Sequence, residues 1–137
     1  ARSPRDEQIR AHLPASLADP GTEFACAWLD GRAVGFTQTR FFPSVWAPGT
    51  EAHLEDLFVS PEARRRAVGR ALVRHVLERA RARGAARVTL NTNLGNREAQ
   101  ALYRSEGFAP QSHELYPDGY EVLWTRSVVD EDGARPR

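Results

Sequence analysis

The stretch from Pro61 to Ala71 carries the strongest chemical signal in this sequence. It connects a hydrophobic strand that ends at Val59 to a long amphipathic helix, and it is rich in arginine and small residues. A loop that opens a helix presents unpaired backbone N–H groups and the positive end of the helix dipole, which together favour phosphate oxygens. Gly69 and Ala71 let these amides approach an anion closely, and four arginines add forked donors: Arg64, Arg65, Arg66 and Arg70.

Two common phosphate motifs do not fit this stretch. It lacks the Lys and Ser/Thr of a P-loop, and its single glycine is too few for a dinucleotide fingerprint. The sequence therefore predicts a phosphate-bearing ligand that is bound by another kind of loop.

Two carboxylates interrupt the strand ahead of the loop. Glu55 and Asp56 stand among apolar residues in the segment 54–59, and strand alternation predicts that they lie on opposite faces. Burial on such a strand would raise the pKa of either carboxyl group, which suits a general base. We favour Glu55 as the base and place Asp56 second. The alternative is a structural carboxylate that an arginine such as Arg40 neutralises.

The remaining reactive side chains show no site pattern. The four histidines are not at metal-ligand spacing with one another or with Cys26, so we expect no metal site. Cys26 itself is expected to be a small buried hydrophobe. Only His53, two residues before Glu55, is kept as a candidate proton relay.

Hydrophobic spacing and turn signals predict the elements that position these residues. Apolar residues recur at helical intervals or alternate along strands, and Gly or Pro marks most of the ends. They predict a helix over 6–17 with the apolar stripe Ile9, Leu13 and Leu17, strands over 24–29 and 33–40, a Pro-rich loop over 41–49, a covered strand over 53–59, a helix from Val68 to Gly84, a strand over 87–92, a helix over 96–106, and a closing hairpin of 108–115 and 120–128.

Composition bounds the class of protein. The chain has 137 residues, of which 41% are hydrophobic, and 19 basic residues balance 18 acidic ones. These values predict one α/β domain over residues 1–137, with a core at about 6–128 and a flexible tail at 129–137. Neither a membrane-spanning run nor a signal segment stands out, so we expect a cytoplasmic protein without a membrane partner.

Three segments share the spacing of one enzyme family. Arg64, Ala67 and Gly69 match Arg/Gln-x-x-Gly-x-Gly/Ala, with Ala67 in place of the first glycine. Residues 54–59 are similar to a fourth strand, and residues 96–108 to an Asn-x-x-Ala-x-x-Leu-Tyr-x-x-x-Gly-Phe segment. Through these motifs the chain resembles the acetyl-CoA-dependent GNAT N-acetyltransferase superfamily.

The resemblance implies a fold and a set of cofactor contacts. The fold is a mixed, mostly antiparallel sheet with a central parallel strand pair, flanked by helices. Acetyl-CoA would serve as cosubstrate, its pantetheine along the backbone of Phe58 and Val59 and its cofactor arm in contact with Asn96. Its pyrophosphate would lie on the loop, at Arg64, Arg65, Arg66, Ala67, Val68, Gly69, Arg70 and Ala71.

The resemblance also implies a reaction. A primary amine of a small molecule or peptide would attack the thioester directly, without a metal, and Tyr103 is similar to the family's general acid. The alternative role for Tyr103 is core packing. Residues 54–57 look like the strand of polyamine-acetylating relatives, and several residues could line a site for a cationic amine: Glu51, Glu114, Asp118, Glu121, Trp28, Trp46 and Trp124.

One part of the family fold has no counterpart here. The usual first strand and first helix would precede Asp6, so we expect a trimmed chain or, if the fold is complete as given, a sheet edge that is open to a partner subunit, with a homodimer as one way to cover it. Two rival functions remain. One is a GNAT-like domain that binds CoA without turnover, and the other, which we do not favour, is a nucleic-acid binder that uses the arginines of residues 62–87.

Overall fold

The computed structural model describes residues 6–45, 49–64, 67–93, 95–111 and 121–129. A short 3-10 turn, Pro61–Ala63, lies between the third strand and the second helix. The elements follow in the order α1 (Asp6–Ala18), β1 (Thr22–Leu29), β2 (Arg32–Pro43), β3 (Thr50–Val59), α2 (Val68–Ala82), β4 (Ala85–Asn93), α3 (Arg97–Ser105), β5 (Ala109–Pro110) and β6 (Glu121–Ser127).

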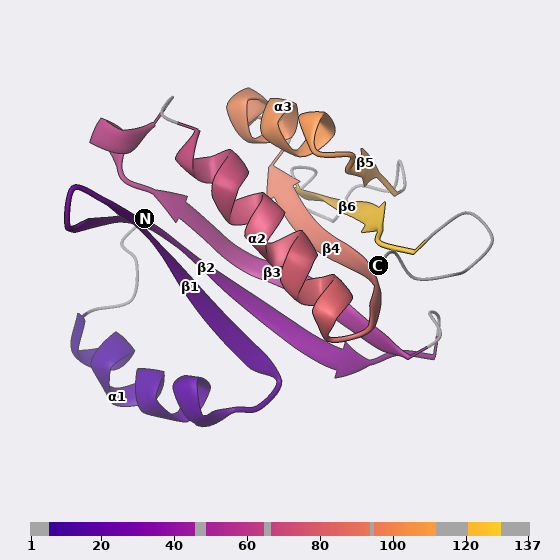
Figure 1. Ribbon diagram of the computed structural model, residues 1–137, viewed down its shortest axis with the longest axis horizontal. Coiled ribbons are helices and arrows are strands. Elements are labelled where there is room, and N and C mark those ends of the chain that lie inside the picture. The colour runs from indigo at the N-terminus through magenta and orange to yellow at the C-terminus, as the bar shows by residue number, and fades with distance from the viewer. Residues whose placement is uncertain (1–5, 46–48, 65–66, 94, 112–120, 130–137) are drawn as a thin grey trace.

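The strands form one mixed sheet in the order β1-β2-β3-β4-β6-β5. Only β3 and β4 pair in parallel, and the other neighbours are antiparallel. Figure 1 shows α2 crossing one face of this sheet between those two strands in the chain, as a parallel pair requires. The predicted fold class, a mixed and mostly antiparallel sheet with a central parallel pair, is confirmed.

The core lies between α2 and the sheet. The apolar residues that predicted this helix are all buried: Val68, Leu72, Val73, Val76, Leu77 and Ala80. They pack against inward side chains of β3, β4 and β6, of which Trp124 and Leu90 are the largest. Burial of this stripe is therefore the main force that seats α2, because amphipathic helices gain most of their stability from tertiary packing.

The first helix differs from its prediction. It forms over Asp6–Ala18, but Ile9, Leu13 and Leu17 are exposed, and the helix buries no residue. Its contacts are with β1, which is an edge strand that pairs only with β2 within the described sheet. Cys26, expected to be buried, is also exposed.

Two further boundaries differ. The Pro-rich loop was expected to start at Phe41, yet β2 continues to Pro43, and Phe41 is buried in the core. Pro43 is the last residue of the strand, a position where the missing N–H costs little. In the closing hairpin only Ala109–Pro110 forms a strand before β6, and residues 112–120 lie outside the described part. None of the helices that the structure describes is both long and apolar enough to cross a bilayer.

Candidate active site

A split between the two parallel strands forms the site. The last paired residues of β3 and β4 are His53 and Thr89, but β3 runs on to Val59 and β4 to Asn93. A cavity of about 850 Å³ opens between these diverging ends, and the starts of α2 and α3 complete its wall. Backbone groups of β3 that face the split have no strand partner on that side, so an extended ligand can pair with them.

The start of α2 brings three amides to this pocket. Among the described residues, the first bond of the helix runs from the Ala71 amide to the Ala67 carbonyl, and the N–H groups of Val68, Gly69 and Arg70 have no partner there. Ala67, Val68, Gly69 and Arg70 line the pocket, whereas Ala71 does not. The predicted contact at Ala71 stays a prediction that the geometry does not support, because its amide is already bonded within the helix.

Ala67 holds the loop in a left-handed conformation. Its φ is 61° and its ψ is 15°, values that cost an alanine about 1–2 kcal/mol relative to a right-handed helical residue. This is the position at which the family signature has glycine. Gly69 packs closely for a different reason: a Cβ there would lie 3.1 Å from Cδ2 of Leu102 on α3, so the Leu102 side chain would have to shift slightly to admit a larger residue.

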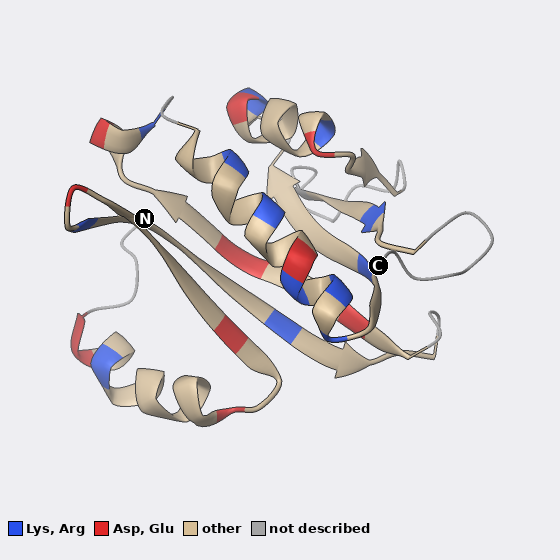
Figure 2. Ribbon diagram, viewed as in Figure 1, with Lys and Arg blue, Asp and Glu red and all other residues tan. Residues whose placement is uncertain are grey.

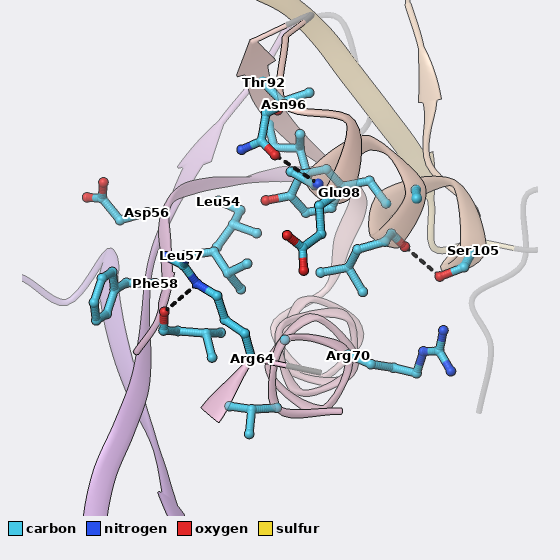
Figure 3. A pocket seen from close by; sticks show the side chains of 18 of the residues that line it. Leu54, Asp56, Leu57, Phe58, Arg64, Arg70, Thr92, Asn96, Glu98 and Ser105 are labelled. Carbon is cyan, nitrogen blue, oxygen red and sulfur yellow. Dashed lines mark hydrogen bonds between the residues drawn. The ribbon is translucent and has the colours of Figure 1, made fainter. Parts of the chain in front are cut away.

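The arginines of the loop divide into two groups. The Nε of Arg64 donates to the carbonyl oxygen of Val59 at 3.3 Å, beside the split. Arg70 instead lies 3.5 Å from Glu106, which also accepts from Arg74, so its guanidinium is directed to the end of α3 (Figure 3). Arg65 and Arg66 lie outside the described residues. Of the described arginines, Arg64 is thus the best placed for a ligand in the split.

A β-bulge places the two carboxylates. Asp56 lies opposite Gln38 and Leu54 opposite Thr39, so Glu55 is the extra residue. The bulge resets the alternation, and both carboxylates lie on the face away from α2 rather than on opposite faces. Figure 3 shows the side chains of Asp56 and Phe58 on the other side of β3 from Glu98, although both residues, like Glu55, border the cavity.

The environment of the carboxylates differs from the expected one. Both are exposed, so burial does not act on them as predicted. Glu55 accepts from Nε of Arg40 at 2.5 Å, which is the neutralised arrangement kept as the alternative. One oxygen of Glu55 is therefore engaged, and the other has no partner among the described residues.

His53 stands at the base of the split. Its Nδ1 lies 2.6 Å from Oγ1 of Thr89 on β4, a contact that fixes the ring. Burial lowers its pKa below 6.5, opposed by Glu55 and Glu51 and assisted by Arg40. The imidazole is therefore neutral at pH 7, and it can accept a proton.

Tyr103 lies in the wall formed by α3. The residue is 7% exposed and lines the pocket, and its ring makes an edge contact with Phe108 at 5.8 Å between centroids. Burial raises the pKa of its phenol above 10, so the hydroxyl keeps its proton at neutral pH. In the described part of the structure this hydroxyl has no hydrogen-bond partner, and it remains available as a donor to a bound group.

Asn96 begins α3 and has a structural task of its own. Its Oδ1 accepts from the Ala99 amide at 3.0 Å, a typical N-cap contact. Asn96 also lines the pocket, with its amide nitrogen left for a ligand. Leu54, Phe58 and Val59 line the opposite wall, so the predicted cofactor residues of β3 and α3 face each other across the split.

The structure adds pocket residues that the sequence did not single out. Asn91, Thr92 and Asn93 come from the free end of β4, and Glu98 from the first turn of α3. Polar residues at the end of a predicted buried strand were the available signal. The sequence does not show that β3 and β4 diverge. It therefore could not predict that these side chains line a cavity and not a sheet surface.

Several residues that were expected to line a site for a cationic amine have other surroundings. Trp124 is buried in the core, and Glu51 is buried in an ion pair with Arg87. Trp28 is exposed on β1. Trp46, Glu114 and Asp118, and the side chain of Glu121, lie outside what the structure describes.

Comparison with known proteins gives the same family as the geometry. The profile of the acetyltransferase (GNAT) family matches residues 2–108. Aminoglycoside N(6')-acetyltransferase type 1 of Klebsiella aerogenes is 32% identical over 103 residues, which are 74% of this chain and 68% of that protein. Human N-acetyltransferase 8 is 39% identical over an alignment that covers 94% of this chain and 58% of the human protein.

A solved structure agrees in fold. The ribosomal-protein-S18-alanine N-acetyltransferase of Escherichia coli superposes with a TM-score of 0.69 at 25% identity, covering 95% of this chain and 83% of that one. The split sheet, the helix start beside it and the matched profile lead to one conclusion. This chain belongs to the acetyltransferase (GNAT) family, whose members use acetyl-CoA.

Proposed function

We propose that this protein transfers the acetyl group of acetyl-CoA to a primary amine by direct attack of the amine on the thioester. The observation that carries the proposal is the split pocket, which has unpaired β3 backbone on one side, three free amides of α2 at one end and a buried Tyr103 on the other wall. Pantetheine needs backbone partners, a diphosphate needs N–H donors, and a leaving thiolate needs an acid.

Different residues of the chain bind different parts of the cofactor. The amides of Val68, Gly69 and Arg70 hold the diphosphate, with the helix dipole and Arg64 adding positive charge. Phe58 and Val59 offer backbone groups to the pantetheine amides, and Asn96 offers its side-chain amide to the cofactor arm. Arg65 and Arg66 remain proposed contacts from sequence alone.

Starting from the protonated amine, the nitrogen must lose two protons and the leaving sulfur must gain one. The amine loses a proton to the free oxygen of Glu55, directly or through water, and Asp56 is the second candidate for this base. The neutral nitrogen then forms a bond to the carbonyl carbon, giving a tetrahedral intermediate. As this collapses, the C–S bond breaks, the Tyr103 hydroxyl donates its proton to the departing sulfur, and the nitrogen loses its second proton through water to the Tyr103 phenolate, which restores the acid.

A second role is kept because Glu55 is tied to Arg40. A domain that binds CoA without turnover would keep the split pocket while its base is neutralised. It would show stabilisation by CoA without release of thiol from acetyl-CoA in the presence of any amine. The nucleic-acid alternative is less favoured, since the basic side of α2 in Figure 2 is largely paired with acids, through Arg70, Arg74, Arg79 and Arg83.

The test joins turnover to cofactor binding. A panel of primary amines is incubated with acetyl-CoA, and thiol release is followed with a thiol-reactive dye. We expect Tyr103→Phe to lower kcat about a hundredfold while CoA binds with wild-type affinity in calorimetry. Full turnover in Tyr103→Phe would remove this residue as the acid. Absence of thiol release from the wild-type protein with every amine, despite CoA binding, would leave the non-catalytic role.

A further inference from the structure

An aromatic pair lies on the face of the sheet away from α2, next to the split. Phe36 of β2 and Phe58 of β3 are directly paired in the strand register, and their ring centroids are 6.0 Å apart. Both remain well exposed, at 38% and 47%. Two large exposed rings in contact on a sheet are a surface that gains free energy when an apolar group covers it.

A single unbalanced charge adjoins this pair. Asp56 lies in the next register position, opposite Gln38, and it has no ion pair among the described residues. The other acids on this face are matched, Glu55 by Arg40 and Glu51 by Arg87, and His53 is neutral at pH 7. The described residues of the face therefore favour one positive charge beside an apolar surface.

The direction of approach follows from the proposed function, on which this inference rests. Pantetheine would fill the side of the split that faces α2 and α3, so an amine reaches the carbonyl from the other face. Its nitrogen would then stand near Glu55 and Asp56, and the atoms attached to it would extend over Phe58 and Phe36. Figure 3 shows Phe58 and Asp56 together on that side of β3.

We propose that the acceptor is a primary amine with one positive charge and an aromatic or branched aliphatic group within two or three bonds of the nitrogen. The charge would be attracted by Asp56 until the amine is deprotonated, and the apolar group would cover the ring pair of Phe36 and Phe58. A free arylalkylamine and a peptide with a hydrophobic first residue share this chemistry.

The ring pair also argues against a polycationic acceptor. A second or third cation would find Arg40 and Arg87 nearby, and every described carboxylate of this face except Asp56 is already paired. Cation–π attraction at an exposed ring adds only about 0.5–1 kcal/mol, which does not offset the loss of apolar contact by a polar body.

The experiment measures the acetylation of four amines by the wild-type protein and three variants at saturating acetyl-CoA. The amines are 2-phenylethylamine, a peptide beginning with phenylalanine, ethanolamine and putrescine. Wild-type protein is expected to show a kcat/KM for 2-phenylethylamine or the peptide at least tenfold above those for ethanolamine and putrescine. The larger kcat/KM of these two substrates shows whether the acceptor is a free arylalkylamine or a peptide N-terminus.

The variants separate the apolar contact from the charge. Phe36→Gln should raise KM for the apolar amine about tenfold and leave ethanolamine unchanged, because Phe36 touches only the body of the substrate. Asp56→Asn should raise KM for both amines by a similar factor. Leu17→Gln, which removes another exposed apolar side chain, on α1, is the matched control and should change neither.

Two outcomes would overturn the inference in distinguishable ways. If thiol is released but putrescine or ethanolamine is preferred, or if Phe36→Gln affects all amines equally, the acceptor class is wrong and the transferase function stands. If no amine supports thiol release while CoA still binds, both the transferase function and the acceptor class are refuted.

Discussion

Ala67 shows how one residue sets the geometry of the phosphate loop. It holds a φ of 61° ahead of α2, a conformation that favours glycine, and this lets the amides of Val68, Gly69 and Arg70 face the same pocket. Departure from the family signature therefore costs stability. The signature has glycine at this position, and the dihedral angles give the physical reason for that preference.

Replacing Ala67 with glycine should relieve this strain. We expect Ala67→Gly to raise the free energy of unfolding by about 0.5–1 kcal/mol, since the relief of about 1–2 kcal/mol is partly offset by the greater entropy of the unfolded chain. CoA affinity should stay equal or become tighter. Urea unfolding and calorimetry measure the two effects.

Ala71 supplies the matched control for that substitution. It is exposed within α2 and has ordinary helical geometry, so Ala71→Gly should destabilise the protein by about 0.5–1 kcal/mol. Equal destabilisation by both substitutions, or clearly weaker CoA binding in Ala67→Gly, would show that the left-handed conformation is not the one adopted in solution.

Glu55 is the residue whose role is tested by pH. If it accepts the amine proton, Glu55→Gln should lower kcat/KM about a hundredfold near pH 7, with a smaller loss at pH 9, where more of the amine is already neutral. The rate of each variant is followed from pH 6 to 9 with one amine. Arg40→Gln is the companion variant, because it frees Glu55 from its ion pair and leaves the carboxylate in place. If Glu55→Gln and the wild type share one pH–rate profile, the general base is Asp56 or water.

At the scale of elements, α2 is held to the sheet by burial on one side and by ion pairs at its end. Glu23 of β1 accepts from Arg79 in two bonds of 2.8 and 2.9 Å, and from Arg83 at 2.9 Å. The hydrogen bonds from Arg79, with those from Arg83, lower the pKa of Glu23 from 4.5 to about 2 against the effect of burial. This cluster ties the edge strand to the helix that opens the cofactor pocket.

The lowered pKa fixes the sign of a stability effect. Because Glu23 is more acidic in the folded state, its contribution is complete above about pH 4.5 and is lost as the pH falls toward 2. Glu23→Gln should be about 1–2 kcal/mol less stable at pH 7, with the difference from wild type shrinking across that window. Thermal unfolding between pH 7 and 2.5 measures it.

Glu78 provides the control for this cluster. It is an exposed acid on the same helix and has no ion pair in the described part of the chain. Glu78→Gln should leave stability within about 0.5 kcal/mol of wild type at every pH. A gap between Glu23→Gln and wild type that stays constant from pH 7 to 2.5 would contradict the role of the Arg79 and Arg83 contacts.

Periodicity predicted the elements that are amphipathic and missed those features that depend on pairing. The stripe from Val68 to Ala80 placed α2 because one face of a helix must be covered. The bulge at Glu55 could not be predicted, since it exists only in the register between β2 and β3, and it reversed the expected placement of the carboxylates. The exposed stripe of Ile9, Leu13 and Leu17 was a second miss, because spacing predicts a face and not what covers it.

At the scale of the whole molecule, the divergence of two parallel strands creates the pocket. Pairing between β3 and β4 ends at His53 and Thr89, and the strand ends beyond them form the walls of the pocket while α2 and α3 bring amides and Tyr103 to it. The proposed phosphate site and the proposed proton donor therefore lie on different elements of one core. The family could be recognised from the motifs, whereas the cavity depends on the divergence of β3 and β4, which no motif records.

The most direct test of this account is a crystal structure of the protein with bound coenzyme A. We predict the diphosphate on the amides of Val68, Gly69 and Arg70, pantetheine along Phe58 and Val59, and the sulfur within hydrogen-bond reach of the Tyr103 hydroxyl. Coenzyme A bound elsewhere, or a split that stays empty at saturating ligand because Arg64 or Glu98 fills it, would contradict the central claim.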